Sequence, residues 1–232
     1  MAIHPCFVHQ RTPGQFEAFD PDTCLATPDT SKPTYLIAGD SHAEHLMPAF
    51  AEHYPEVNME AAGGTGCRPL IEQRGDWYCP QIMRLALDGR IPEGAIDGVI
   101  LSARWEADEF ERLHETVDFL SRYVDRIVIL GPTPEYLDSF PKLLARGLIR
   151  DRTDMSPYAN PEVPELDAEM AAEDWGPKVR YISMYDLLCA DGCPSYTEGG
   201  VPFHPDYGHY TREAAAEVMD KLDALGLVPP QG

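Results

Sequence analysis

A serine and an aspartate–histidine pair lie far apart along this 232-residue chain. Ser41 follows Gly39 and Asp40, and Asp206 precedes His209 by three positions. In an Asp-x-x-His motif, a short turn lets the carboxylate hydrogen-bond one imidazole nitrogen, so that the other nitrogen can take a proton from a serine hydroxyl. The sequence therefore predicts nucleophilic acyl transfer, with Ser41 as nucleophile, His209 as base and Asp206 as the group that orients the base.

The segment around Ser41 predicts an exposed position for its hydroxyl. Residues 35–38 are an apolar run typical of a buried strand, and residues 42–53 have the spacing of an amphipathic helix. At such a turn, the helix N-terminus favours a developing negative charge. The alternative is that Ser41 only caps the helix, since serine is a preferred N-cap residue. The turn alone favours capping, and the Asp-x-x-His motif reverses that preference.

Strand and helix patterns alternate along the rest of the chain. The predicted strands are residues 35–38, 57–62, 97–103, 126–131 and 179–184. The predicted helices are residues 42–53, 81–87, 107–124, 139–147, 165–175 and 212–225. We expect an α/β fold, a three-layer α/β/α sandwich with a mainly parallel sheet of about five strands. Residues 34–228 are predicted to form the catalytic domain, and residues 1–33, which prolines interrupt, an irregular N-terminal arm.

Several motifs together resemble the SGNH, or GDSL-like, hydrolase superfamily. They are Gly-Asp-Ser-His-Ala at 39–43, Gly-Cys-Arg-Pro-Leu at 66–70, Asp-Leu-Leu-Cys at 186–189 and Asp-x-x-His at 206–209. The chain is most similar to the periplasmic SGNH domains fused to acyltransferase-3 membrane proteins, which O-acetylate bacterial surface and cell-wall polysaccharides. The resemblance spans residues 32–225. It implies an SGNH/flavodoxin-like fold with the triad Ser41, His209 and Asp206.

The resemblance also implies donors for an oxyanion. A glycine-rich turn allows a backbone N–H to approach an oxyanion closely. Gly66 best matches the family's small residue before cysteine, Gly63 and Gly64 stay open, and the alternative is a turn without a donor role. Many SGNH enzymes carry a Gly-x-Asn-Asp segment where this chain has Arg104 and Trp105. The third donor thus stays open between Arg104, the Trp105 indole and a backbone amide. The alternative is that Trp105 covers the core and Arg104 pairs with a surface carboxylate.

Three further residues lie near predicted strand ends or motifs. Thr133 lies in a rigid Pro-Thr-Pro turn at the carboxyl end of a predicted strand, so Thr133 and Glu135 are expected to face the cleft. His204 is close to the Asp-x-x-His motif. We interpret it as a surface residue of the loop.

Six cysteines allow several pairings, and sequence proximity favours Cys6–Cys24, Cys67–Cys79 and Cys189–Cys193. A zinc site is the alternative, but no Cys-x-x-Cys pair occurs and the histidines lack zinc-finger spacing. Disulfides imply an oxidising compartment, which in a Gram-negative bacterium is the periplasm. We expect no metal and no cofactor.

The charge balance restricts the partners of this protein. Eighteen Lys and Arg against 39 Asp and Glu give a formal net charge of −21. This surface argues against nucleic acid and against electrostatic docking to anionic lipid, but not against a neutral sugar. No stretch has the length of a membrane span, and residues 1–4 lack the features of a signal peptide. We expect the domain natively to follow a membrane anchor or signal.

These observations favour a serine-dependent O-acetyltransferase or O-acetylesterase. Its substrates would be an acetyl donor and a carbohydrate, with O-acetylation of a bacterial cell-surface polysaccharide as the expected role. The resemblance implies a link to a membrane acyltransferase domain and an extracytoplasmic location, tethered to the inner membrane. The alternatives are an SGNH esterase or lipase-like hydrolase of small esters, against which no long apolar lid is visible, and a non-catalytic carbohydrate-binding domain, against which the complete Ser–His–Asp set argues.

Overall fold

The computed structural model describes residues 5–9, 19–27, 29–75, 77–149 and 154–229. Within them, a six-stranded sheet has the order β1-β3-β2-β4-β5-β6, and all five strand pairings are parallel. The strands are β1 (Phe7–Val8), β2 (Thr34–Gly39), β3 (Asn58–Gly64), β4 (Gly98–Ser102), β5 (Ile127–Leu130) and β6 (Val179–Ile182). The predicted α/β fold with a parallel sheet is confirmed, with one strand more than expected.

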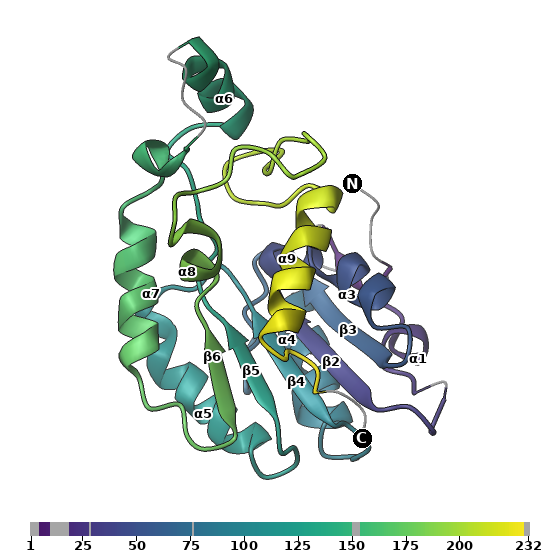
Figure 1. Cartoon of the computed structure of the whole chain (residues 1–232). Coiled ribbons are helices and arrows are strands. Elements are labelled where there is room, and N and C mark those ends of the chain that lie inside the picture. Colours follow the sequence, from purple (N-terminus) through teal and green to yellow (C-terminus); the bar gives the residue numbers. More distant parts are fainter. Residues whose placement is uncertain (1–4, 10–18, 28, 76, 150–153, 230–232) are drawn as a thin grey trace.

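Helices cover both faces of the sheet (Figure 1), which explains why β2, β4 and β5 are buried along their whole length. Helices α3 (Met47–His53) and α9 (Arg212–Ala224) pack together on one face. The other helices are α1 (Pro21–Cys24), α2 (Ser41–Glu44), α4 (Tyr78–Met83), α5 (Phe110–Leu120), α6 (Phe140–Ile149), α7 (Glu162–Ala172) and α8 (Met184–Cys189). A π-helical segment, Arg84–Arg90, continues α4, and 3₁₀ turns occur at Ala107–Glu109 and Ser156–Tyr158.

The strand order places a topological switch at β2. The chain runs from β2 to β3 on one side, and then crosses to β4 on the other side of β2. In open parallel sheets, ligands bind at the carboxyl ends of the strands beside such a switch. A site is therefore expected among the segments that follow β2, β3 and β4.

The helix predicted over residues 42–53 is in fact two helices. α2 ends at Glu44, and α3 begins at Met47 with Pro48 in its first turn. Proline lacks the N–H that a continuous helix needs, but it is tolerated in a first turn. α8 was not predicted as a helix; the hydroxyl of Ser183 caps it by accepting a hydrogen bond from the Asp186 N–H.

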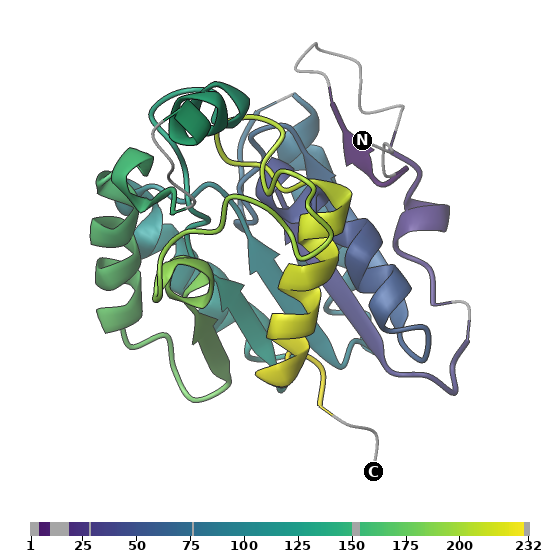
Figure 2. The same ribbon diagram turned by 45° about the horizontal axis from the view of Figure 1, so that its top comes forward.

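The described part of the N-terminal arm is not irregular throughout. β1 pairs with the end of β3, with Phe7 opposite Gly63 and Val8 opposite Gly64 (Figure 2). Asp20 caps the short helix α1, and the Cys6–Cys24 disulfide joins α1 to the residue that precedes β1. A two-residue strand is too short to produce a recognisable alternation, which is why the sequence pattern missed it.

The three predicted disulfides, Cys6–Cys24, Cys67–Cys79 and Cys189–Cys193, are present. They use all six cysteines, so the alternative of a cysteine-ligated zinc is wrong. Disulfides persist in oxidising compartments, which agrees with an extracytoplasmic domain.

In the described ranges, no helix combines the length and the apolar character that crossing a membrane requires.

Candidate active site

Ser41 follows β2 directly. Gly39 ends that strand with its backbone so close to β4 that a Cβ would lie 1.7 Å from the Ser102 carbonyl oxygen, so only glycine fits there. Asp40 is the N-cap of α2, because its carboxylate accepts the His42 N–H at 2.9 Å. The alternative in which Ser41 caps the helix is wrong. Ser41 is the first helical residue, and its hydroxyl is available for another partner.

That partner is His209. The Ser41 Oγ lies 2.8 Å from His209 Nε2, and His209 Nδ1 lies 2.7 Å from Asp206 Oδ2. Because a carboxylate only accepts hydrogen bonds, Nδ1 carries a proton and Nε2 is the nitrogen that accepts from the serine. The other Asp206 oxygen accepts the backbone N–H groups of Gly208 and His209, which fixes the turn of the loop. The structure thus brings together three side chains in the hydrogen-bonding order of a nucleophile, a base and an orienting acid.

The electrostatics of this pair favour its charged form. Burial opposes the imidazolium of His209, but the hydrogen bond and charge of Asp206 outweigh burial and raise the pKa of His209. Burial likewise opposes the Asp206 carboxylate, but hydrogen bonds from the His209 ring and from two backbone N–H groups lower the pKa of Asp206 strongly. An imidazolium formed during a reaction would therefore be stabilised where it forms.

A cavity of about 470 Å³ opens in front of the Ser41 hydroxyl. Its walls come from β1, from the loop after β3, from the segment after β4 and from the Asp206–His209 loop. They comprise Phe7, His9, Asp40, Ser41, Glu44, Thr65, Gly66, Arg68, Arg104, Glu106, Asp206, Tyr207 and His209. A small ester or a sugar hydroxyl can therefore approach Ser41.

Of the three candidate glycines, the structure brings only Gly66 to this cavity. Gly66 has a φ of +69°. Among the described residues its N–H has no hydrogen-bond partner. Gly63 and Gly64 lie inside β3, which runs further than predicted. The Gly63 N–H donates to the Cys6 carbonyl of the N-terminal segment, and Gly64 packs against the ring of Tyr78. The predicted end of this strand at residue 62 is wrong, because Gly63 pairs with β2 and β1 and Gly64 pairs with β1.

Arg104 and Trp105 have different environments. The Trp105 indole is buried and donates to the Leu130 carbonyl at 2.7 Å, so this N–H is not available to an oxyanion. The Arg104 side chain forms a bidentate pair with Glu135, at 2.7 and 2.9 Å. The Glu135 side chain is only 8% exposed, so the partner of Arg104 is not the surface carboxylate of the alternative interpretation. The Arg104 guanidinium also lies over the ring of Tyr207.

Arg68 holds Asp40 in place, a role that sequence reasoning missed. Its Nη1 donates to Asp40 Oδ2 at 2.6 Å, and its other nitrogens bind Glu106 and Glu109. The Arg104 backbone N–H donates to the same Asp40 oxygen. Arg68 belongs to the Gly-Cys-Arg-Pro-Leu segment, which served only as a family marker. The arginine was noticed in this motif, but the motif does not reveal its partner, because Asp40 lies 28 positions away in the sequence.

His204 is buried, so our interpretation of it as a surface residue is wrong. It is 1% exposed and packs against the rings of Tyr136, Phe140 and Phe203. Its Nδ1 donates to the His209 carbonyl oxygen at 2.9 Å, so His204 helps to fix the backbone of the Asp206–His209 loop. Burial lowers the pKa of His204 to about 4.

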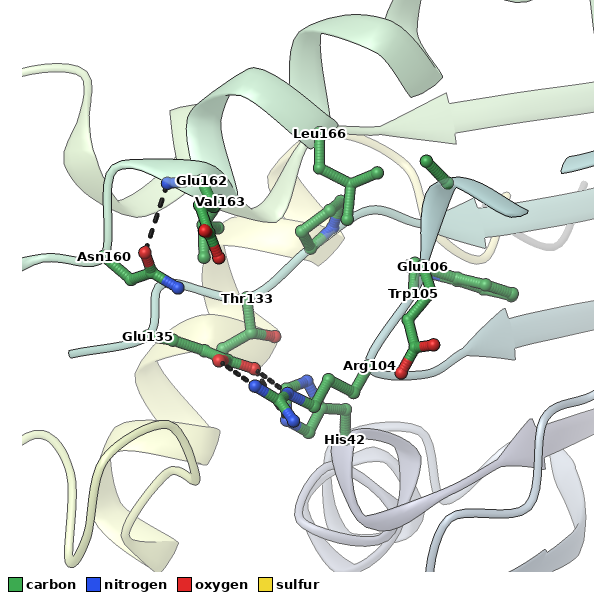
Figure 3. A pocket seen from close by; sticks show the side chains of 12 residues that line it. His42, Arg104, Trp105, Glu106, Thr133, Glu135, Asn160, Glu162, Val163 and Leu166 are labelled. Carbon is green, nitrogen blue, oxygen red and sulfur yellow. Dashed lines mark hydrogen bonds and ion pairs between the residues drawn. The ribbon is translucent and has the colours of Figure 1, made fainter. Parts of the chain in front are cut away.

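Thr133 and Glu135 do face a cavity, as predicted (Figure 3). This second cavity measures about 360 Å³, and it shares Arg104 and Glu106 with the cavity in front of Ser41. The site therefore consists of two adjoining hollows.

Comparison with known proteins identifies one family. The model of the SGNH domain that is fused to AT3 domains matches residues 5–224. The comparison with curated proteins gives no match. Among solved structures, the periplasmic domain of a lipopolysaccharide acetyltransferase from Salmonella ser. Paratyphi A is similar over 96% of this chain and 91% of that chain, with 18% identity and a TM-score of 0.78. At this identity, the likeness shows a shared fold.

Two other structures are more distant. The C-terminal catalytic domain of peptidoglycan O-acetyltransferase A from Streptococcus pneumoniae has 11% identity and a TM-score of 0.44, over 84% of this chain and 93% of that chain. A carbohydrate acetylesterase from Sinorhizobium meliloti has 15% identity and a TM-score of 0.44, over 84% of this chain and all of that chain.

Proposed function

This chain belongs to the family of SGNH domains that are fused to AT3 domains, and on that premise we propose that it catalyses serine-dependent transfer of an acetyl group to or from carbohydrate hydroxyls. The observation that carries the proposal is the continuous hydrogen-bonded series from Ser41 through His209 to Asp206. The open cavity in front of Ser41 supports it further, since a nucleophile must be reachable.

The reaction proceeds in two steps. Ser41 Oγ attacks the acetyl carbonyl carbon while His209 Nε2 takes the hydroxyl proton. The tetrahedral intermediate collapses, His209 returns the proton to the leaving oxygen, and an acetyl-serine remains. In the second step a sugar hydroxyl or water gives its proton to His209 and attacks the acetyl-serine, which frees Ser41. Asp206 keeps the proton on His209 Nδ1 throughout and stabilises the imidazolium.

Two backbone groups are the proposed donors to the oxyanion. They are the N–H of Ser41, in the first turn of α2, and the N–H of Gly66. Removing one such donor typically costs ~10²–10³ in rate. The contacts described above argue against an oxyanion role for Gly63, Gly64 and the Trp105 indole. We assign Arg104, which lines the cavity, to substrate binding.

The biological setting follows from the family. We propose that the acceptor is a bacterial cell-surface polysaccharide, and that a membrane acyltransferase domain linked to this one supplies the acetyl group. The domain would then work in the periplasm, tethered to the inner membrane. Whether water or a sugar takes the acetyl group depends on which of them reaches the acetyl-serine first.

The Ser41→Ala variant tests the nucleophile. We expect release of 4-nitrophenol from 4-nitrophenyl acetate to fall at least ~10³-fold, because no acetyl-enzyme can form. The wild type should also be labelled covalently by a fluorophosphonate probe, and the variant should not. A variant with full activity or full labelling would refute the assignment.

A further inference from the structure

The second cavity adjoins the one in front of Ser41, at the carboxyl ends of β4 and β5. Its walls come from the segment after β4, from the segment after β5 and from the start of α7 (Figure 3). The lining residues that matter here are His42, Arg104, Glu135, Asn160, Val163 and Leu166. The triad uses none of these side chains.

His42 is the polar group in this wall that lacks a partner. It is 2% exposed, and neither ring nitrogen has a hydrogen-bond partner among the described residues. Its Nε2 lies 3.8 Å from Glu135 Oε1, which is too long for a hydrogen bond. Burial lowers the pKa of His42, so the ring is neutral and offers one donor and one acceptor. Because an unpartnered buried polar group is costly, a ligand hydroxyl, which both donates and accepts, complements this ring.

The remaining lining has one charged edge and one apolar face. Arg104 holds Glu135 through two hydrogen bonds, and the Asn160 Oδ1 accepts the Glu162 N–H, which leaves its amide NH₂ as a donor. Val163 and Leu166 supply the apolar face. A pyranose ring has this same division, with hydroxyls at its edge and C–H groups on its face. The carboxylates of Glu135, Glu106 and Glu162 disfavour an anionic ligand, and an acyl chain would leave the polar groups unpaired.

We propose that this cavity binds one pyranose ring of the acceptor carbohydrate and directs a hydroxyl of that ring towards Ser41. The inference rests on the proposed function. Arg104 and Glu106 line both cavities, and the His42 ring lies 5.6 Å from the ring of His209, centroid to centroid. A sugar seated here is therefore adjacent to the base that must take its proton.

The experiment compares two esters that share an acetyl group and differ in the leaving group. By microscopic reversibility, the sugar of glucose pentaacetate leaves from the site that an acceptor occupies, whereas 4-nitrophenyl acetate carries no sugar. The readout is the ratio of kcat/KM for the sugar ester to kcat/KM for the aryl ester. Leu166→Trp narrows the cavity, and Ala168→Trp introduces the same side chain on an exposed position of α7 as a matched control.

We expect Leu166→Trp to lower this ratio at least about tenfold, and Ala168→Trp to leave both rates unchanged. Asn160→Ala, which removes a donor without adding bulk, should lower the ratio in the same direction by several fold. An unchanged ratio in both cavity variants would overturn the proposal. If that unchanged ratio comes from an equal loss for both esters, the cavity has an acyl-binding or structural role instead. If the wild type hydrolyses only the aryl ester, the proposal for this cavity is also overturned, but the assignment of Ser41 as nucleophile stands. If the wild type hydrolyses neither ester, the proposed function itself is refuted.

Discussion

Two pairs of a carboxylate with a basic side chain flank Ser41, and they differ in whether the basic side chain can exchange its proton. On one side, Asp206 binds His209, and the Asp206 side chain is 44% exposed. On the other side, Asp40 binds Arg68, and the Asp40 side chain is 2% exposed. A histidine exchanges its proton near neutral pH, whereas an arginine stays charged. The first pair is therefore suited to proton transfer and the second to holding a turn, although both rest on a carboxylate close to the same serine.

The largest expected effect comes from breaking the first pair. Asp206→Asn should lower kcat for 4-nitrophenyl acetate by ~10³–10⁴, the loss typical of serine hydrolases, because the amide favours the wrong tautomer of His209. Steady-state kinetics measure it. Asp220→Asn, at an exposed carboxylate far from Ser41 in the sequence, should keep full activity. A loss below tenfold in Asp206→Asn would mean that His209 does not depend on this carboxylate.

Breaking the second pair should chiefly affect stability. Arg68→Ala leaves the buried carboxylate of Asp40 without its guanidinium, which we expect to cost about 3 kcal/mol in the free energy of unfolding. Urea unfolding followed by circular dichroism measures this cost. Arg112→Ala removes an exposed arginine whose guanidinium donates to the Ile71 carbonyl, and should change stability by less than ~0.5 kcal/mol. Equal costs in the two variants would contradict a structural role for Arg68.

The two pairs also differ in how far the sequence could predict them. The contact of Ser41 with His209, and of His209 with Asp206, could be predicted because each residue lies in a short motif whose chemistry can be worked out from adjacent residues. The parallel α/β fold was found because its strands are continuous apolar runs. The bond between Arg68 and Asp40 was missed, because it joins segments that only the folded chain brings together.

His204 was misplaced for a related reason. A histidine in a loop next to prolines and a glycine looks exposed, and only the rings of Tyr136 and Phe140, which come from another segment, bury it. Likewise, the extent of β3 depends on its pairing with β1, which no local pattern reveals. Burial and register are properties of contacts between distant segments.

His204 can be compared with His209. Its Nδ1 bonds a backbone carbonyl, whereas that of His209 bonds a carboxylate. The unfolded chain binds a proton at His204 near pH 6.5, and the folded chain only near pH 4. As the pH falls between these values, the unfolded state takes up more protons, so stability is lost. From pH 7 to pH 5 we expect His204 to contribute a loss of about 2 kcal/mol. Urea unfolding at both pH values should show a smaller loss in His204→Gln than in the wild type. The control His114→Gln, at a partly exposed histidine, should lose as much as the wild type; equal losses in all three proteins would count against a buried neutral His204.

The smallest expected effect is a shift in the pH profile. His209 must be neutral to accept the serine proton, and its pKa is raised, so kcat/KM should rise with pH around a midpoint above the ordinary value of about 6.5. In Asp206→Asn, burial remains and the stabilising carboxylate is gone, so the midpoint of the residual activity should move to lower pH. If the midpoint is the same in both proteins, His209 is not the group whose protonation controls kcat/KM.

The Cys67–Cys79 bridge has a consequence for when the enzyme becomes competent. It closes the loop that begins immediately after Gly66 and contains Arg68, so the proposed oxyanion donor and the arginine that holds Asp40 lie next to one sulfur link. The disulfide constrains the unfolded chain and so favours the native arrangement of this loop. Before oxidation the loop lacks that constraint. Oxidation of the newly made polypeptide should therefore favour the ordered arrangement of Gly66 and Arg68 beside Ser41.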